Sequence, residues 1–462
     1  MVRRFLAAFA SAALFFGTAH SADVKAVGAP KTETADVKVL RGPKGEEIWY
    51  VSDHTLPMIA MSVAIPAGSA YDPQGKSGLS AFAASLIDEG AGNLNATAFQ
   101  TALSNRAIRL SISPNRDWLV VSLVTLTDNA KDAFQLLGLA LSKPRFDPDA
   151  IQRVRAQILE SIQQEDTDPP TVAAKGFYRA FFHDHPYAHP VSGDAATVNA
   201  ITQADLKAFA AEHWTRGDLK IAVSGDVDAA TLTSLLNSAF GRLPAKSPPQ
   251  LPWPAHIGQP GIQIIPLAEP QPSVVFGLPG LMRSDRDFIP AFVANYIVGG
   301  GGFSSRLTEE VRVKRGLTYD IDTSLNSLRR AGYVAGEFAT KQSSVQDAIG
   351  VVRDTLKEFA DNGPTDKELA DAKTYLTGSF PMSFSSNVGI VGELNGFQQV
   401  GLPVDYVQKR NGLIEAVTAA DVKRAARRVF NPRAMTIVIG GSPQASHASK
   451  PSTPGEAHAA HH

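Results

Sequence analysis

The distribution of apolar and polar positions predicts a chain that contains both strands and helices throughout. Apolar runs of strand length occupy residues 45–51, 58–66, 118–127 and 220–227. Apolar residues spaced three and four positions apart predict helices over residues 130–141, 148–164 and 202–213. The last of these helices begins at Thr202, whose hydroxyl is suited to cap it. The pattern therefore predicts an α+β fold.

A proline-rich stretch interrupts this pattern near the middle of the chain. Residues 243–260 read LPAKSPPQLPWPAHIGQP and contain six prolines. Proline removes a backbone donor and fixes φ, so this stretch cannot lie inside a helix or a central strand. We interpret it as a linker between two domains, at residues 37–242 and 261–441.

The two sides of the linker resemble each other in sequence. The segment ITQADLKAFA from Ile201 matches VTAADVKRAA from Val417. IAVSGD from Ile221 matches IVIGGS from Ile437, at the same separation along the chain. A third pair, PDAIQRVRAQILES and TDKELADAKTYLTGS, matches at nearly the same separation. Matches at a nearly constant separation indicate two copies of one α+β domain.

The N-terminus has the layout of a secretory signal peptide at residues 1–21. Two arginines precede the apolar run of residues 5–16, and small residues follow at 17–22. The apolar run is too short to span a bilayer, and no later segment is long and apolar enough. We therefore expect export, to the periplasm, without stable membrane insertion. The absence of cysteine from the sequence suits an oxidising compartment.

The overall charge excludes one class of protein, the general binder of polyanions. Lys and Arg number 44 against 45 Asp and Glu, a net charge of −1. Without a basic surplus, we expect no nucleic-acid partner. The last residues, 442–462, are rich in Pro, Ser, Ala and His, and this composition predicts a disordered tail.

One predicted helix has the spacing of a metal site without the ligands. Residues 78–90 read GLSAFAASLIDEG, and their apolar residues form one packing face. We place Ala81, Ala84, Ser85 and Asp88 on the opposite, open face. Two histidines four positions apart on such a face could share a metal ion, but Ala81 and Ser85 occupy those positions.

This helix resembles the inverted zinc motif H-x-x-E-H of the pitrilysin and mitochondrial-processing-peptidase family, the inverzincins. On that resemblance Ala81 and Ser85 replace the two histidines, and Ala84 replaces the glutamate that acts as general base. The third zinc ligand of the family falls on Ser161 or, with a shift of one residue, on Glu160. The resemblance implies two homologous domains, each an antiparallel sheet packed with helices, facing each other like a clamshell.

A second segment, at residues 299–321, also resembles this family. Residues 299–321 read GGGGFSSRLTEEVRVKRGLTYDI, and a helix is expected over 304–315 with a serine cap. Arg312 and Tyr319 have the seven-residue spacing of the family's second-domain signature, which implies that they bind the substrate carbonyl. A guanidinium and a phenol are donors suited to an oxygen on which negative charge develops. The alternatives are a surface ion pair of Arg312 with Glu309 and a half-buried strand position for Tyr319.

The resemblance implies a zinc-free subunit of a heterodimeric metallopeptidase, inactive alone and without a cofactor of its own. A homologous partner chain would supply zinc and the base, while Arg312 and Tyr319 would act on a peptide substrate in trans. The alternative is a non-enzymatic structural or peptide-binding homologue. A third possibility is a self-contained hydrolase that uses a metal at His183, Asp184, His185 and His189.

One further family feature is weak in this sequence, and two motifs of other protein classes are not supported. The family strand that pairs with substrate backbone corresponds to residues 106–111, which lack its glycines and asparagine, so strand addition there is doubtful. A Ser/His/Asp hydrolase is not supported, because the sequence has no G-x-S-x-G turn. A phosphate-binding loop at residues 299–302 is also unsupported, since the Lys and Ser/Thr that should follow are missing.

Overall fold

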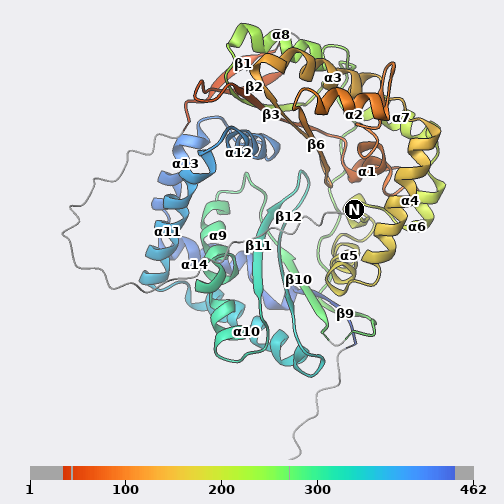
Figure 1. Ribbon diagram of the computed structural model, residues 1–462. Coiled ribbons are helices and arrows are strands. Elements are labelled where there is room, and N and C mark those ends of the chain that lie inside the picture. The colour runs from red at the N-terminus through yellow and green to blue at the C-terminus, as the bar shows by residue number, and fades with distance from the viewer. Residues whose placement is uncertain (1–34, 43–44, 270, 443–462) are drawn as a thin grey trace, which may run out of the picture. The chain divides into compact units, whose positions relative to one another are not determined.

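The computed structural model describes residues 35–42, 45–269 and 271–442 (Figure 1). The predicted signal peptide and the predicted tail beyond residue 442 lie outside the described residues. The predicted strands correspond to β2 (Glu47–Ser52), β3 (Met58–Ile65), β7 (Leu119–Leu126) and β8 (Lys220–Gly225). Their ends differ from the predicted ends by a few residues, as expected when apolar runs set the prediction.

The first sheet belongs to the first half of the chain, residues 37–242. Beyond the four strands above, it contains β1 (Lys38–Arg41) and β6 (Arg109–Pro114), in the order β1-β2-β8-β3-β7-β6. All neighbours are antiparallel except β2 and β8, which run parallel. Strands β4 (Gly90–Ala91) and β5 (Leu94–Asn95) form a separate short ribbon.

The second sheet belongs to the second half, residues 261–441, and repeats the first. Its strands are β9 (Gly261–Ile265), β10 (Ser273–Pro279), β11 (Ile321–Ser327), β12 (Gly332–Ala339) and β13 (Thr436–Gly440). Their order is β11-β12-β10-β13-β9, and only β13 and β9 run parallel. Apart from β1, the two sheets have the same strand order, so the sequence repeat is also a repeat of topology. The sheets are antiparallel, as expected, apart from this one parallel pair in each.

The helices alternate with these strands and confirm the α+β class. The first half contains α1 (Leu79–Ala84), α2 (Ala96–Ser104), α3 (Ala130–Ser142), α4 (Pro148–Glu165), α5 (Pro169–Phe182), α6 (Ala195–Ala200), α7 (Gln203–His213) and α8 (Ala229–Phe240). The second half contains α9 (Phe288–Asn295), α10 (Val345–Asn362), α11 (Asp366–Ser379), α12 (Asn387–Gln399), α13 (Tyr406–Glu415) and α14 (Ala419–Val429). Thr202 caps α7, and Thr418 caps α14 in the same way at the matching position of the second half.

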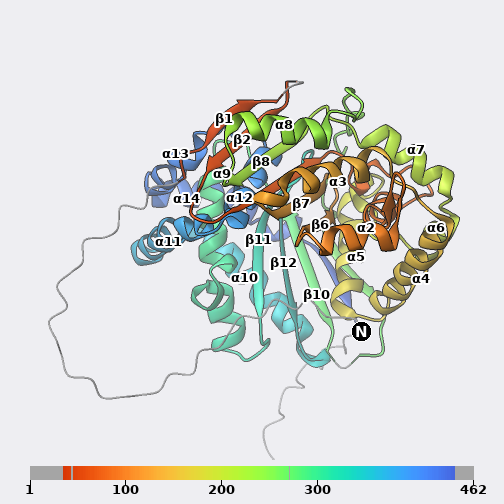
Figure 2. The same cartoon turned by 45° about the horizontal axis from the view of Figure 1, so that its top comes forward.

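One helix of each half packs on the sheet of the other half. Helix α5 packs on β10 and β13 of the second sheet, and α12 packs on β3 and β8 of the first. Figures 1 and 2 show α5 beside β10 and α12 beside the first sheet. Polar contacts support the exchange: the Ser224 hydroxyl donates to Asn387 Oδ1 at 2.7 Å, and Asn395 Nδ2 donates to the Lys220 carbonyl at 2.8 Å. The described residues accordingly belong to one compact unit.

The proline-rich residues 243–260 form neither helix nor strand, as predicted, but they are held against the first half. Leu243 and Leu251 are buried, and the Arg216 N–H donates to the Pro244 carbonyl at 3.0 Å. The domain boundaries on either side stay predictions. Within the described ranges, no helix has both the length and the hydropathy needed to cross a bilayer.

Candidate functional site

The helix that resembles the zinc motif is shorter than expected and is fixed at both ends. Helix α1 ends at Ala84 rather than near residue 90, and the Ser85 hydroxyl donates back to the Ala81 carbonyl at 2.9 Å. At its start, the Asp72 carboxylate accepts from the Gly78 and Ser80 N–H groups, each at 2.8 Å. Burial raises the pKa of Asp72 to about 7 in spite of these bonds.

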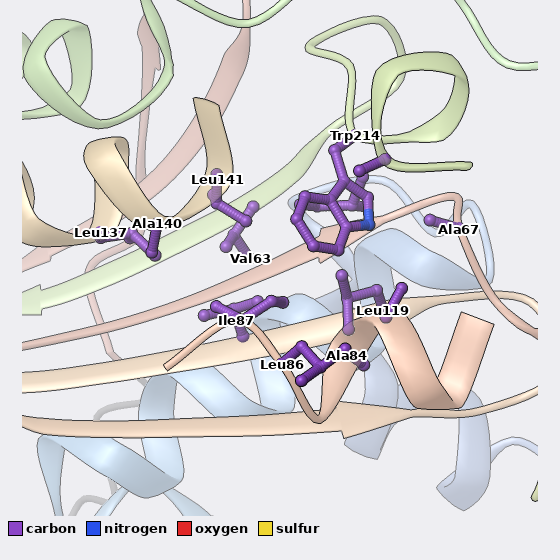
Figure 3. Packing of buried hydrophobic residues seen from close by; sticks show 14 of the residues in the cluster. Val63, Ala67, Ala84, Leu86, Ile87, Leu119, Leu137, Ala140, Leu141 and Trp214 are labelled. Carbon is purple, nitrogen blue, oxygen red and sulfur yellow. The ribbon is translucent and has the colours of Figure 1, made fainter. Parts of the chain in front are cut away.

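The three positions of the lost motif have different surroundings. Ala81 is half-buried and Ser85 is exposed, but Ala84 is only 1% exposed, so its predicted place on the open face is wrong. Figure 3 shows Ala84 near Leu86 and Leu119 in the apolar core. The Ala84 methyl group lies within the core. Ser85 is the only polar side chain of the three, and its hydroxyl donates to the Ala81 carbonyl of the same helix. These residues do not fit a zinc ion.

The other proposed metal positions do not form a site either. Glu160 and Ser161, on α4, are both exposed. Both ring nitrogens of His185 are engaged, since Nε2 lies 3.0 Å from the Pro252 carbonyl and Nδ1 accepts from the Tyr187 N–H. In the part of the chain that the structure describes, no three His, Cys, Asp or Glu side chains converge as metal ligands. The geometry therefore does not support a metal site at His183, Asp184, His185 and His189.

The segment before β11 has an unusual backbone. Helix α9 continues into a π-helical turn at Tyr296–Gly300, and a second π-helical turn at Thr308–Val313 carries Arg312. The predicted helix is thus present but shorter and wider, and the Ser305 hydroxyl accepts from the Thr308 N–H at its start. A Cβ atom at Gly299 would overlap Thr323 of β11, so glycine lets the first turn approach the sheet. Such turns often occur at functional sites.

Arg312 and Tyr319 both keep free donors. The Arg312 guanidinium lies over the Phe303 ring at 4.7 Å and, among the described residues, has no ion pair or hydrogen bond. The expected alternative partner, Glu309, is not used. Tyr319 is 81% exposed and precedes β11, which excludes the half-buried strand position. Phe303 and Val313 are also exposed, at 77% and 62%. The segment therefore presents a guanidinium, a phenol and apolar surface together on nearby residues of one chain segment.

The structure also brings together three residues that the sequence pattern does not connect. Ser52 Oγ lies 3.0 Å from His54 Nε2, and His54 Nδ1 lies 2.6 Å from Asp226 Oδ1. This is the hydrogen-bond order of a hydrolase triad. However, the His54 side chain is 64% exposed, and the neighbouring Asp53 and Thr55 N–H groups already donate to other oxygens. Without those donors an oxyanion would not be stabilised there. No sequence motif marks this group, because His54 and Asp226 are far apart along the chain.

Comparison with known proteins matches both halves of the chain. The family pattern for insulinase (peptidase family M16) matches residues 47–195, and that for the peptidase M16 inactive domain matches residues 200–376. An uncharacterized zinc protease of Mycobacterium tuberculosis is 30% identical over 333 residues, 70% of this chain and 73% of the relative. The non-peptidase homolog YmxG of Helicobacter pylori is 26% identical over 373 residues, 81% of this chain and 86% of the relative.

A solved structure shows the same fold over nearly the whole described chain. The peptidase M16 inactive domain from Pseudomonas fluorescens superposes with a TM-score of 0.84 at 29% identity, covering 89% of this chain and 98% of that one. The resemblance to the pitrilysin and processing-peptidase family is thus confirmed. The chain belongs to peptidase family M16, as an inactive member of that family.

Proposed function

We propose that this chain is the zinc-free subunit of a heterodimeric M16 metallopeptidase that processes or degrades peptides. Its partner is a homologous chain that carries zinc, activates water and supplies the base. Arg312 and Tyr319 of this chain donate hydrogen bonds to the substrate carbonyl oxygen in the partner's site. The pair thereby stabilises the negative charge that develops on that oxygen.

One contrast supports this proposal above all. The chain cannot hold the metal at Ala81, Ala84 and Ser85, yet its Arg312 and Tyr319 donors are unengaged within the described residues. A guanidinium that is not paired with Glu309 and a phenol that is 81% exposed are available to a ligand from outside the chain. The exposed Phe303 and Val313 beside them are suited to a protein or peptide contact.

A structural or peptide-binding role is the second candidate, favoured by the relative that is named a non-peptidase homolog. Reconstitution separates the two. The chain purified alone should cut no quenched fluorescent peptide. Together with an M16 chain that has an intact H-x-x-E-H motif from the same organism, it should give chelator-sensitive cleavage that neither chain gives alone. A stable complex without cleavage would favour the structural role. Chelator-sensitive cleavage by this chain alone would contradict the proposal.

The proposal includes export to the periplasm, which rests on residues 1–21 of the sequence. The mature chain should appear in the periplasmic fraction and be shorter than the full chain by about the length of a signal peptide. Replacing both Arg3 and Arg4 by Glu should keep the precursor in the cytoplasm. A full-length chain in the cytoplasm of the unmodified strain would exclude export.

A further inference from the structure

A cavity in the second half has a chemical character that the proposed function does not use. Its volume is about 550 Å³, within the range of small-molecule sites. Helices α9, α12 and α13 and strand β11, whose places in the fold are labelled in Figure 1, supply most of its lining residues. Its apolar lining is mainly aromatic and comprises Phe288, Phe292, Phe380, Phe397 and Tyr406, together with Leu325 and Val400.

Two arginines in this lining are held in place by the aromatic rings. The Arg283 guanidinium lies 4.2 Å from the Phe288 ring centre and donates to the Tyr406 hydroxyl at 2.5 Å. The Arg410 guanidinium lies 4.2 Å from the Phe380 ring centre. Stacking on rings fixes a guanidinium while leaving its N–H groups free to bind a planar anion.

Neither guanidinium has a carboxylate partner in the described part of the chain. Arg410 donates only to the Leu376 carbonyl and the Asn411 side chain, each at 3.0 Å. By contrast, Arg428 of the same half makes ion pairs with Asp285 and Asp287. An unpaired guanidinium in a partly buried site loses hydration without gaining a counter-charge, so an anionic ligand would stabilise it.

The charges around Arg410 are consistent with this interpretation. Burial lowers the pKa of Arg410, and repulsion from Arg283 lowers it further, while Tyr406 and Glu393 oppose the shift. Glu393 also lines the cavity, and it makes no ion pair with either arginine. The cavity thus offers two cations, one separate carboxylate and aromatic walls.

We propose that this cavity binds a short zwitterionic peptide or amino acid with an apolar side chain. The ligand carboxylate would be bound by Arg283 and Arg410, its ammonium by Glu393, and its side chain by the aromatic rings. The site is formed by this chain alone. It therefore does not rest on Arg312, Tyr319 or a partner chain, and the failure of either proposal leaves the other intact.

Calorimetric titration of the full chain with the dipeptide Leu-Phe tests this proposal. Leu-Phe should bind, and its C-terminal amide and its N-acetyl derivative should each bind about tenfold more weakly or worse, because each loses one charged contact. Arg283→Gln should weaken the preference for the free carboxylate, which Arg410 alone would then bind. Glu393→Gln should remove the preference for the free amine and spare the carboxylate preference.

Two further variants keep the test interpretable. Arg433→Gln removes the same charge from an arginine outside the cavity and should leave Leu-Phe binding unchanged. Arg410→Gln also loses the bond to the Leu376 carbonyl, which affects folding, so Arg283→Gln tests the carboxylate contact and Glu393→Gln tests the ammonium contact. Absence of Leu-Phe binding up to about 1 mM would overturn the proposal. So would equal binding of the blocked and unblocked dipeptides.

Discussion

At the scale of single residues, the positions of α1 that resemble the zinc motif carry no metal ligands, but the helix is still packed in the core. Ala84 is buried among apolar side chains, and Ser85 is engaged with the Ala81 carbonyl. The position that the resemblance assigns to the family's base, Ala84, is part of the core in this chain. A carboxylate placed there would lose its hydration and find no metal-bound water to act on.

Ala84→Glu should therefore destabilise the chain by about 2 kcal/mol or more, because it buries a charge without a partner. Urea denaturation of the purified chain measures this change. Ser85→Glu is the matched control at an exposed position one residue later, and its effect should stay within about 0.5 kcal/mol. Equal effects of the two substitutions would show that residue 84 is open to solvent.

Asp72, which caps α1, makes stability depend on pH. Its folded-state pKa, raised from 3.8 to about 7, means that the folded chain holds a proton that the unfolded chain releases between these values. The free energy of unfolding should therefore fall as pH rises from about 4 to 7, by up to about 3 kcal/mol from this group.

Comparison with Asp72→Asn isolates this contribution, because the variant cannot titrate at residue 72. The stability difference between the native chain and the variant should shrink or reverse as pH rises from about 4 to 7. Denaturation curves at several pH values give this difference. A native chain that gains stability over the variant across this range would show that Asp72 is a charged cap with a lowered pKa.

At the scale of elements, apolar spacing predicts the strands and the longer helices well. It does not predict where α1 stops or that the Arg312 segment is π-helical. Helix α1 ends at Ala84, and the backbone that follows turns toward β4. The first π-helical turn depends on contact between Gly299 and Thr323 of β11. Because these residues are distant along the chain, the local spacing of apolar residues cannot predict this turn.

Gly299→Ala tests whether that close contact stabilises the fold. Its Cβ atom would overlap the Thr323 side chain, so the free energy of unfolding should drop by about 1–3 kcal/mol. Gly350→Ala is the matched control, since a Cβ atom in that α10 position meets nothing within 4 Å. It should be neutral or stabilising by up to about 1 kcal/mol. Thermal unfolding of both variants measures the contrast, and equal shifts would argue against close packing at Gly299.

At the scale of the whole molecule, the sequence repeat predicts two similar halves but not the exchange of helices between them. Apolar spacing shows that α5 and α12 have faces to bury, yet it does not say which sheet covers them. The structure supplies that answer through contacts such as Asn395, which is 1% exposed and donates to backbone carbonyls of the first sheet. Likewise, the sequence locates Arg312 and Tyr319 but not their exposure.

Because the halves share these helices, they should unfold in one cooperative transition. Three of the four tryptophans lie in the first half and the fourth, Trp253, lies in the proline-rich stretch. Fluorescence therefore reports mainly the first half, whereas circular dichroism reports both halves. The two signals should give the same urea midpoint. Asn395→Ala should lower both midpoints together, since it removes two hydrogen bonds between the halves, at a cost of about 0.5–1.5 kcal/mol each. Separate midpoints would show that the halves are independent.

The proposed function depends on Arg312 and Tyr319 as hydrogen-bond donors to a substrate carbonyl in the zinc site of another chain. The most direct test is peptide turnover by the reconstituted complex, with Arg312→Ala and Tyr319→Phe compared with Arg315→Ala, whose guanidinium is engaged with Glu310. We expect the first two substitutions to lower kcat about 100-fold or more while the complex still assembles, and the third to change kcat little. Unchanged kcat in Arg312→Ala and Tyr319→Phe would contradict the proposed function.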